Sequence, residues 1–281
     1  MTILITGATG AVGRHLVAVL LAAGEDVRAV SRDPEKAALP SGVDVVAADL
    51  ADASSLDDDV FAGVDRAFVF PSDATDTFME AAVAAGVDRF VVLSSLAAAE
   101  EFPRDHGSAS QVHHAAVEAA VTSRTDRWTI LRPGTFANNL LSWAYPISNG
   151  FPVRAPYVQS AQAPIHEADV ADAAAAALRS EEWVGHAIAM TGPGALTRAD
   201  QVAAIAAAIG RPIELVDISA DEFRAETSAF IPQPIMTMLL DYWSDTLTTP
   251  DRVRPVTPLT GRPGRTLAQW ARDHRADFGA A

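Results

Sequence analysis

Short apolar runs alternate with longer stretches of helical periodicity through the first half of the chain. The apolar runs lack strict polar–apolar alternation, so we expect strands that are covered on both faces. They occupy residues 3–6, 27–31, 43–47, 66–70, 89–95 and 128–133. Between them, residues 11–24 and 78–86 carry apolar residues at helical spacing and end in glycine. The pattern predicts an α/β fold, a doubly wound parallel sheet with helices on both faces.

The second half is less regular. Pro, Gly and aromatic residues interrupt the pattern from 134 to 165, and residues 230–243 form a second apolar segment; both are predicted to be irregular. Regular elements are expected as helices at 167–178 and 197–210 and strands at 186–190 and 213–218. We therefore expect residues 1–134 to form the sheet core, and residues 135–281 to complete it and form a small C-terminal α/β substrate lobe. Together these would make one structural unit.

Charge and composition exclude several classes of function. Asp and Glu number 36 against 21 Lys and Arg, a formal charge of −15 that disfavours nucleic acid and anionic membranes. The chain has no cysteine, which excludes disulfides and thiolate chemistry. No apolar run is long enough to span a bilayer, and the first residues do not resemble a signal peptide, so we expect a cytoplasmic location. Monomer and homodimer both stay open.

The strongest motif is the glycine-rich stretch TGATGAVG at residues 6–13, between the first predicted strand and helix. Gly7 permits a tight turn, Gly10 lets the backbone approach a diphosphate, and Gly13 lets the helix pack closely on the sheet. The backbone of Thr9, Ala11 and Val12 belongs to the same phosphate-binding helix start. This context of strand, turn and helix predicts a dinucleotide site.

The end of the second predicted strand bears on which dinucleotide binds. A carboxylate there usually contacts the ribose hydroxyls of NAD, whereas this chain has Ser31 followed by Arg32. A hydroxyl and a guanidinium suit a 2′-phosphate, so NADP(H) is preferred over NAD(H). The alternative is that Arg32 is a solvated surface charge, with Asp33 and Glu35 close by.

Several motifs together resemble a known family. The glycine-rich turn, Asp49-Leu50, the LSS at 93–95, the WTILRPGTF at 128–136 and the PIHEADVADAAAAAL at 164–178 occur in the order typical of atypical short-chain dehydrogenases. The chain is most similar to their NmrA-like, NAD(P)H azoreductase-like and quinone reductase-like group, which implies a Rossmann fold. The resemblance also implies contacts with the cofactor. Asp49 and Leu50 would contact the adenine, and Phe70 and Pro71 would line the cofactor groove. Ser94 and the backbone around Pro133–Phe136 would lie near the nicotinamide.

The family's catalytic helix is altered in this chain. Aligning Glu118 of SASQVHHAAVEAA (108–120) with a glutamate common in NmrA-like proteins puts His114 at the usual lysine position and Ser110 at the usual tyrosine position. Lys36 is the single lysine of the chain, so no lysine replaces the missing one. His114 could bind the nicotinamide ribose or deliver a proton, or it could fill space without chemistry. A metal pair of His114 with Glu118 and a Ser110–His114 hydrolase pair are both disfavoured, and no metal site is predicted.

The two irregular segments are expected to meet beyond the carboxyl ends of the strands and to form an apolar substrate pocket. Tyr145 and Tyr242 are candidates for a relocated acid in this pocket. For Met236, packing in the core of the lobe is an alternative role. The predicted pocket residues are Phe136, Asn138, Trp143, Tyr145, Met236 and Tyr242.

These features predict an NADPH-dependent oxidoreductase that transfers hydride to a small hydrophobic acceptor, a quinone-like molecule or an aromatic ketone or enone. Such an acceptor can take its proton from solvent, so the absence of the tyrosine impairs its reduction less. Two alternatives stay open. The protein could be a non-catalytic NADP(H)-binding redox sensor, or a secondary-metabolism tailoring enzyme, an isomerase or cyclase, on the same fold.

Overall fold

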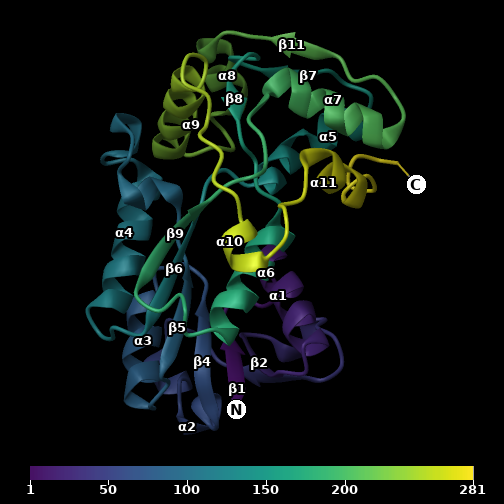
Figure 1. The fold of residues 1–281 in the computed structure, drawn as a ribbon. Helices are drawn as coiled ribbons and strands as arrows, with labels where there is room; N and C mark the ends of the chain where they lie inside the picture. Colours follow the sequence, from purple (N-terminus) through teal and green to yellow (C-terminus); the bar gives the residue numbers. More distant parts are fainter. Residues whose placement is uncertain (281) are drawn as a thin grey trace.

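The computed structural model describes residues 1–280 and contains a seven-stranded sheet whose neighbouring strands are all parallel (Figure 1). The strand order β3-β2-β1-β4-β5-β6-β9 reverses direction between β1 and β4, as in doubly wound Rossmann folds. The predicted fold class is therefore confirmed. The strands of this sheet are β1 (Thr2–Ile5), β2 (Asp26–Ser31), β3 (Val43–Ala47), β4 (Val64–Val69), β5 (Arg89–Leu93), β6 (Trp128–Pro133) and β9 (His186–Met190).

Helices cover both faces of the sheet, which explains why most residues of its strands are apolar. Ile3 and Ile5 point to the face covered by α1 (Ala11–Ala22) and α6 (Glu167–Arg179), and Leu4 points to the opposite face. That opposite face is covered by α2 (Asp58–Phe61), α3 (Thr75–Ala84) and α4 (Ala109–Thr122), and Figure 1 shows α3 and α4 on the side away from α1 and α6. Burial of alternate side chains on both faces is the main stabilising contribution.

The remaining elements form a lobe over the carboxyl ends of the strands, with small cores of its own (Figure 1). The predicted strand at 213–218 is shorter than expected and lies outside the central sheet, where it pairs with β7 of the lobe. One of the remaining elements, α10 (Thr257–Thr260), instead packs against α6 and contributes Leu259 to the core of the sheet. The lobe's elements are α5 (Ala144–Ser148), β7 (Val153–Ala155), β8 (Ala161–Gln162), β10 (Leu196–Thr197), α7 (Arg198–Ile209), β11 (Leu215–Asp217), α8 (Ala220–Thr227), α9 (Gln233–Asp245) and α11 (Leu267–Asp273).

The prediction of an irregular segment at 230–243 was wrong, because α9 spans most of it. The two prolines at 232 and 234 lie at the start of the helix, where a missing backbone N–H costs no helical hydrogen bond. Met236 and Leu240 form the buried side of α9.

Short 3-10 helices shape the loops at the carboxyl edge of the sheet. Two of them, η3 (Leu96–Ala99) and η4 (Pro103–Asp105), connect β5 to α4, and η5 (Ala137–Trp143) follows β6. Two others, η1 (Pro34–Lys36) and η2 (Ala53–Ser55), follow β2 and β3. The loop η3–η4 and helix α9 pack against each other across the sheet's edge.

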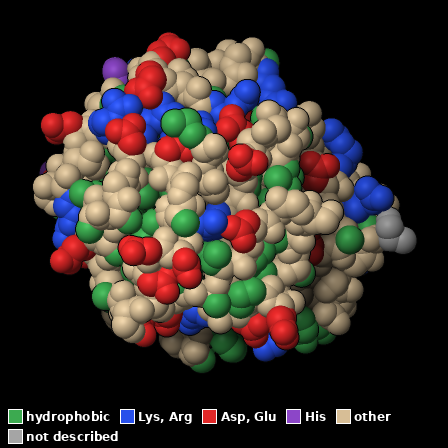
Figure 2. Space-filling model, turned by 90° about the horizontal axis from the view of Figure 1, so that it is seen from below, with side chains coloured by type: hydrophobic (Ala, Val, Ile, Leu, Met, Phe, Trp, Pro, Cys, Tyr) green, Lys and Arg blue, Asp and Glu red, His purple; other side chains and the backbone are tan. Residues whose placement is uncertain are grey.

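Acidic and basic side chains are interspersed on the face viewed in Figure 2, without a continuous basic area. Within residues 1–280, no helix has both the length and the apolar character that a bilayer span requires.

Candidate functional site

The turn between β1 and α1 needs glycine at two positions. Gly7 has φ of +65°, and a Cβ there would lie 2.7 Å from the Phe70 side chain. A Cβ at Gly13 would lie 2.2 Å from the carbonyl oxygen of Gly7, so α1 packs directly on the turn. Only residues without a Cβ permit both approaches.

Helix α1 begins at Ala11, after Gly10, and no side chain caps its first turn. Thr9, Gly10 and Ala11 are exposed, whereas Val12 and Gly13 are buried. The first turn also carries no acidic residue. Its backbone N–H groups and the positive end of the helix dipole can therefore receive a phosphate group.

Phe70 and Pro71 follow β4 at the point where the strand order reverses. The Thr6 hydroxyl donates to the Phe68 carbonyl oxygen (3.1 Å) and accepts from the backbone N–H of Phe70 (2.7 Å). These two bonds tie the end of β1 to the end of β4. The Phe70 ring remains 40 % exposed beside Gly7, where it can line a cofactor groove.

The ends of β2 and β3 lie next to this groove. The Ser31 hydroxyl accepts from the backbone N–H of Asp33 (3.2 Å) and donates to its carbonyl oxygen (3.0 Å), so it closes a local turn. Arg32 is exposed, and within the described residues its guanidinium has no hydrogen bond or ion pair. Asp49 is exposed and Leu50 half-buried after β3. Within the described residues, Arg32 is thus a cation without a partner directly after β2.

Glu118 connects helix α4 to the carboxyl ends of β5 and β6. Its carboxylate accepts from Arg132 through both oxygens (2.8 and 2.5 Å) and from the Ser94 hydroxyl (2.5 Å). Ser94 is 2 % exposed and Glu118 9 % exposed. This bond to Glu118 raises the pKa of Arg132 above its ordinary value. Glu118 therefore acts as an ion-pair partner within the protein and fixes the direction of the Ser94 hydroxyl.

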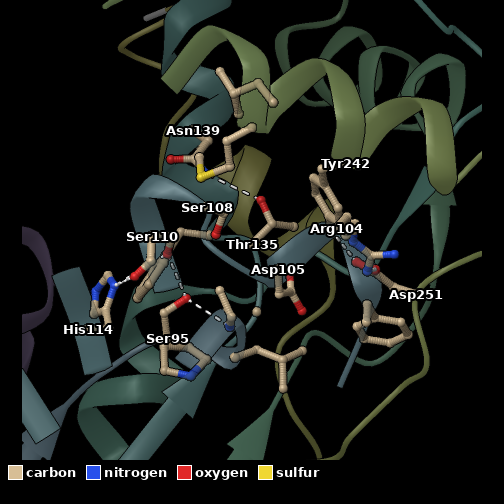
Figure 3. A pocket seen from close by; sticks show the side chains of 18 of the residues that line it. Ser95, Arg104, Asp105, Ser108, Ser110, His114, Thr135, Asn139, Tyr242 and Asp251 are labelled. Atoms are coloured by element: carbon tan, nitrogen blue, oxygen red, sulfur yellow. Dashed lines mark hydrogen bonds and ion pairs between the residues drawn. The ribbon is translucent and has the colours of Figure 1, made fainter. Parts of the chain in front are cut away.

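A cavity of about 260 Å³ opens at the carboxyl ends of β5 and β6, between the η3–η4 loop, α4 and α9 (Figure 3). Five predicted site residues line it from the sheet and α4: Ser94, Ser110, His114, Pro133 and Phe136. Tyr242 lines it from α9. The cavity walls also include Phe102, Met238 and Leu239, which make one side apolar.

A backbone hydrogen bond fixes the orientation of the His114 ring. Its Nδ1–H donates to the carbonyl oxygen of Ser110 at 2.8 Å, so Nε2 is an acceptor when the ring is neutral. Burial lowers the pKa of His114, although the bond to Ser110 opposes the shift. The Ser110 hydroxyl donates to the Ser95 hydroxyl at 3.2 Å (Figure 3). In its neutral form, His114 can accept a hydrogen bond from a ligand hydroxyl through Nε2.

The Tyr242 hydroxyl forms a hydrogen bond within the protein. Its hydroxyl donates to the carboxylate of Asp251, and the Arg104 guanidinium lies 5.1 Å from its ring centre. Arg104 in turn pairs with Asp245 and lies 3.9 Å from Asp251 (Figure 3). Burial, and then the charge of Asp251, raise the pKa of Tyr242 well above its ordinary value.

Four predicted pocket residues do not line the cavity. Tyr145 is 72 % exposed at the surface of the lobe. Trp143 and Met236 are buried in the lobe's own cores, because large apolar side chains gain more from burial there than from a hydrated wall. Asn138 is half-buried outside the cavity, and its neighbour Asn139 lines the wall instead.

Sequence reasoning missed the charged residues of the cavity wall. The apolar lining from α9, Met238 and Leu239, was expected from the segment 230–243, and both residues are half-buried. Arg104 and Asp105 follow β5 in FPRD (102–105), where loops after strands commonly carry functional groups. The pairing of Arg104 with Asp245 on α9 could not be predicted from the local sequence, because the two residues are 141 positions apart.

Comparison with known proteins identifies the family. Residues 7–181, more than half of the chain, match the model described as NAD(P)H-binding. The chain belongs to the NAD(P)H-binding family. One member is a reductase of Streptomyces griseus for (4-alkanoyl-5-oxo-2,5-dihydrofuran-3-yl)methyl phosphate, 36 % identical over 98 % of this chain and 99 % of that protein. The NAD(P)H azoreductase of Xenophilus azovorans is 32 % identical over 99 % of this chain and all of its own length.

A solved structure extends the likeness to the whole fold. The NADPH-dependent quinone oxidoreductase of Escherichia coli, crystallised with NADPH, is 25 % identical, with a TM-score of 0.81 over 96 % of this chain and 99 % of that chain. The expected resemblance to azoreductase-like and quinone reductase-like proteins is thus confirmed. This member of the NAD(P)H-binding family is an NAD(P)H-dependent oxidoreductase.

Proposed function

We propose that the protein uses NADPH to reduce an uncharged conjugated carbonyl compound, a quinone or an enone, in the cavity beside β5 and β6. The observation that carries the proposal is the composition of this cavity. Ser94, Pro133 and Phe136, which are expected beside the nicotinamide, form one side, and Phe102, Met238 and Leu239 form an apolar bed on another. A flat apolar acceptor would therefore bind where hydride becomes available.

The residues around the groove fit the cofactor. The turn at Gly7–Gly13 leaves backbone N–H groups open to a diphosphate, and the close packing at Gly13 leaves no space for a side chain there. When bound, the reduced nicotinamide supplies a hydride. His114 would accept a hydrogen bond from the ribose through Nε2, and Ser94, oriented by Glu118, would support the carboxyl end of β5 beside the ring.

Charge in the cavity favours an acceptor without phosphate. Arg104 is already paired with Asp245 and close to Asp251, and Asp105 adds a further carboxyl group to the lining. A phosphate at this wall would meet carboxylates rather than a free cation, which costs free energy in a partly desolvated site. The natural acceptor therefore differs in charge from the phosphate ester named for the Streptomyces griseus reductase.

Acceptor-dependent oxidation tests the reductase function. With NADPH at a fixed concentration, we expect loss of nicotinamide absorbance only when a quinone or an enone is added, and faster loss with neutral acceptors than with phosphorylated analogues. Tight nucleotide binding without turnover over a wide panel would favour a redox sensor instead. Product formation without NADPH consumption would favour the isomerase or cyclase alternative.

The preference for NADPH depends on Arg32. Because this guanidinium is exposed and unpaired within residues 1–280, it can bind a 2′-phosphate with charge-assisted hydrogen bonds. We expect Arg32→Ala to weaken NADPH binding by about 1.5–3 kcal/mol and to leave NADH binding nearly unchanged. Calorimetric titration of both nucleotides measures this difference. Arg272→Ala, at an exposed arginine of α11, serves as the control, and equal losses for the two nucleotides in Arg32→Ala would contradict the preference.

A further inference from the structure

Reduction of a conjugated carbonyl consumes one hydride and one proton, and the groups predicted from the sequence are poor proton donors. Burial lowers the pKa of His114, which disfavours its protonated form, and its Nδ1–H is donated to the Ser110 carbonyl oxygen. The Tyr242 hydroxyl donates a hydrogen bond to Asp251, and deprotonation of Tyr242 would place a phenolate beside a carboxylate. Tyr145 lies outside the cavity.

Asp105 is differently placed. It ends η4, in the loop between β5 and α4, and its side chain lines the cavity. In Figure 3, Asp105 lies between the Ser95, Ser110 and His114 side and the Arg104, Tyr242 and Asp251 side. An acceptor in the cavity would therefore have this carboxyl group beside it.

The surroundings of Asp105 favour its protonated form. Burial raises the pKa of this carboxyl group above its ordinary value, while Arg104 and the backbone N–H of Phe102 oppose the shift. His106, on the same loop, also lowers it slightly, and the charge of Asp251 raises it. From α9, Tyr242 and Asp245 face the same region, and Asp245 takes up much of the charge of Arg104 by pairing with it.

We propose that Asp105 is the acid that protonates the acceptor during reduction. The inference rests on the proposed function. In the step, hydride adds to the β-carbon of the conjugated system and the carbon–carbon π electrons move toward the carbonyl oxygen. The Asp105 O–H bond then breaks as its proton joins the α-carbon, or the oxygen of a quinone. Asp105 is left as a carboxylate, water reprotonates it after product release, and the net change is acceptor plus NADPH plus one proton giving reduced acceptor plus NADP⁺.

Asp105→Asn tests the step, because the amide keeps the shape and cannot donate an acidic proton. We expect kcat for quinone or enone reduction to fall about 100-fold with KM changed less than about threefold, as for loss of a general acid. Wild-type kcat should decrease as pH rises through the pKa of Asp105, and the variant should lose that dependence. Asp105→Glu should recover part of kcat, and Asp241→Asn, an exposed carboxyl of α9, should behave as wild type.

A readout without nucleotide separates catalysis from structure. Infrared pH titration of the free protein should show a carboxyl band that persists above the usual range of aspartate and disappears in Asp105→Asn. If Asp105→Asn keeps kcat within about threefold of wild type, or keeps its pH profile, Asp105 is not the acid although the reductase function stands. If none of the quinones or enones supports NADPH oxidation by the wild type, the proposed function itself fails, and the step fails with it.

Discussion

Gly13→Ala is expected to weaken NADP(H) binding at least about 100-fold, close to 3 kcal/mol. The added Cβ would lie 2.2 Å from the Gly7 carbonyl oxygen and 2.7 Å from the Ala8 Cα. Both are backbone atoms, so the clash cannot be relieved by rotating a side chain, and either α1 or the turn must move. Overpacking of this kind costs about 1–3 kcal/mol in the free energy of unfolding as well. Calorimetric titration gives the dissociation constant, and thermal unfolding shows whether the variant is folded at the temperature used.

Gly194→Ala is the matched control for this prediction. No atom beyond its chain neighbours lies within 4 Å of a Cβ built there. We expect its nucleotide binding to equal that of the wild type. A folded Gly13→Ala protein with an unchanged dissociation constant would contradict the assignment of this turn to the diphosphate, whereas loss of folding would show only that α1 needs the close approach.

Glu118→Gln is expected to lower the free energy of unfolding by about 3 kcal/mol, the lower end of the range for breaking a buried ion pair. The amide cannot neutralise Arg132, whose side chain is 22 % exposed, and it presents one acceptor oxygen where Arg132 and Ser94 now use two. The lower end applies because partial exposure lets water solvate the stranded guanidinium. Urea denaturation, analysed with an unchanged slope, measures the loss.

Glu226→Gln provides the comparison. Glu226 forms a similar multidentate pair with Arg154, but both side chains are about two-fifths exposed, so we expect a loss below about 1 kcal/mol. Equal losses for the two variants would show that Glu118 does not hold a buried charge.

The same substitution should also affect catalysis. Because Ser94 is no longer oriented, acceptor reduction by Glu118→Gln should be slower even at temperatures where the variant is fully folded.

The local parts of the fold could be predicted because their causes are local. Strands β1 to β6 are mostly apolar on both faces, and helices α1, α3, α6 and α7 carry apolar residues at helical spacing. The type of each element could therefore be predicted from its own sequence. The glycine-rich turn could be predicted in the same way, since the positive φ of Gly7 and the close contact of Gly13 with the Gly7 carbonyl oxygen both arise within the turn. Helix α9 was missed because Pro232 and Pro234 mark a helix start and a loop equally well.

The site could be predicted only on the side that the sheet and α4 provide. Ser94, Ser110, His114 and Phe136 were predicted from the resemblance to NmrA-like proteins, and all four line the cavity at the carboxyl ends of β5 and β6. Apolar character alone did not separate Met236, in the core of the lobe, from Met238, in the cavity wall. Which side of α9 faces the cavity depends on how the lobe packs over the sheet.

The amino-acid sequence by itself determined the doubly wound sheet, the nucleotide turn and the loss of the usual tyrosine and lysine, because these depend on periodicity, on glycine and on residue identity. Only the tertiary structure decided that Asp105 and Arg104 share a cavity with Tyr242 and Asp251, and that Glu118 binds Arg132 and Ser94. Contacts between residues so distant in the chain arise from the packing of whole elements, and that packing sets the burial and charge on which their chemistry depends.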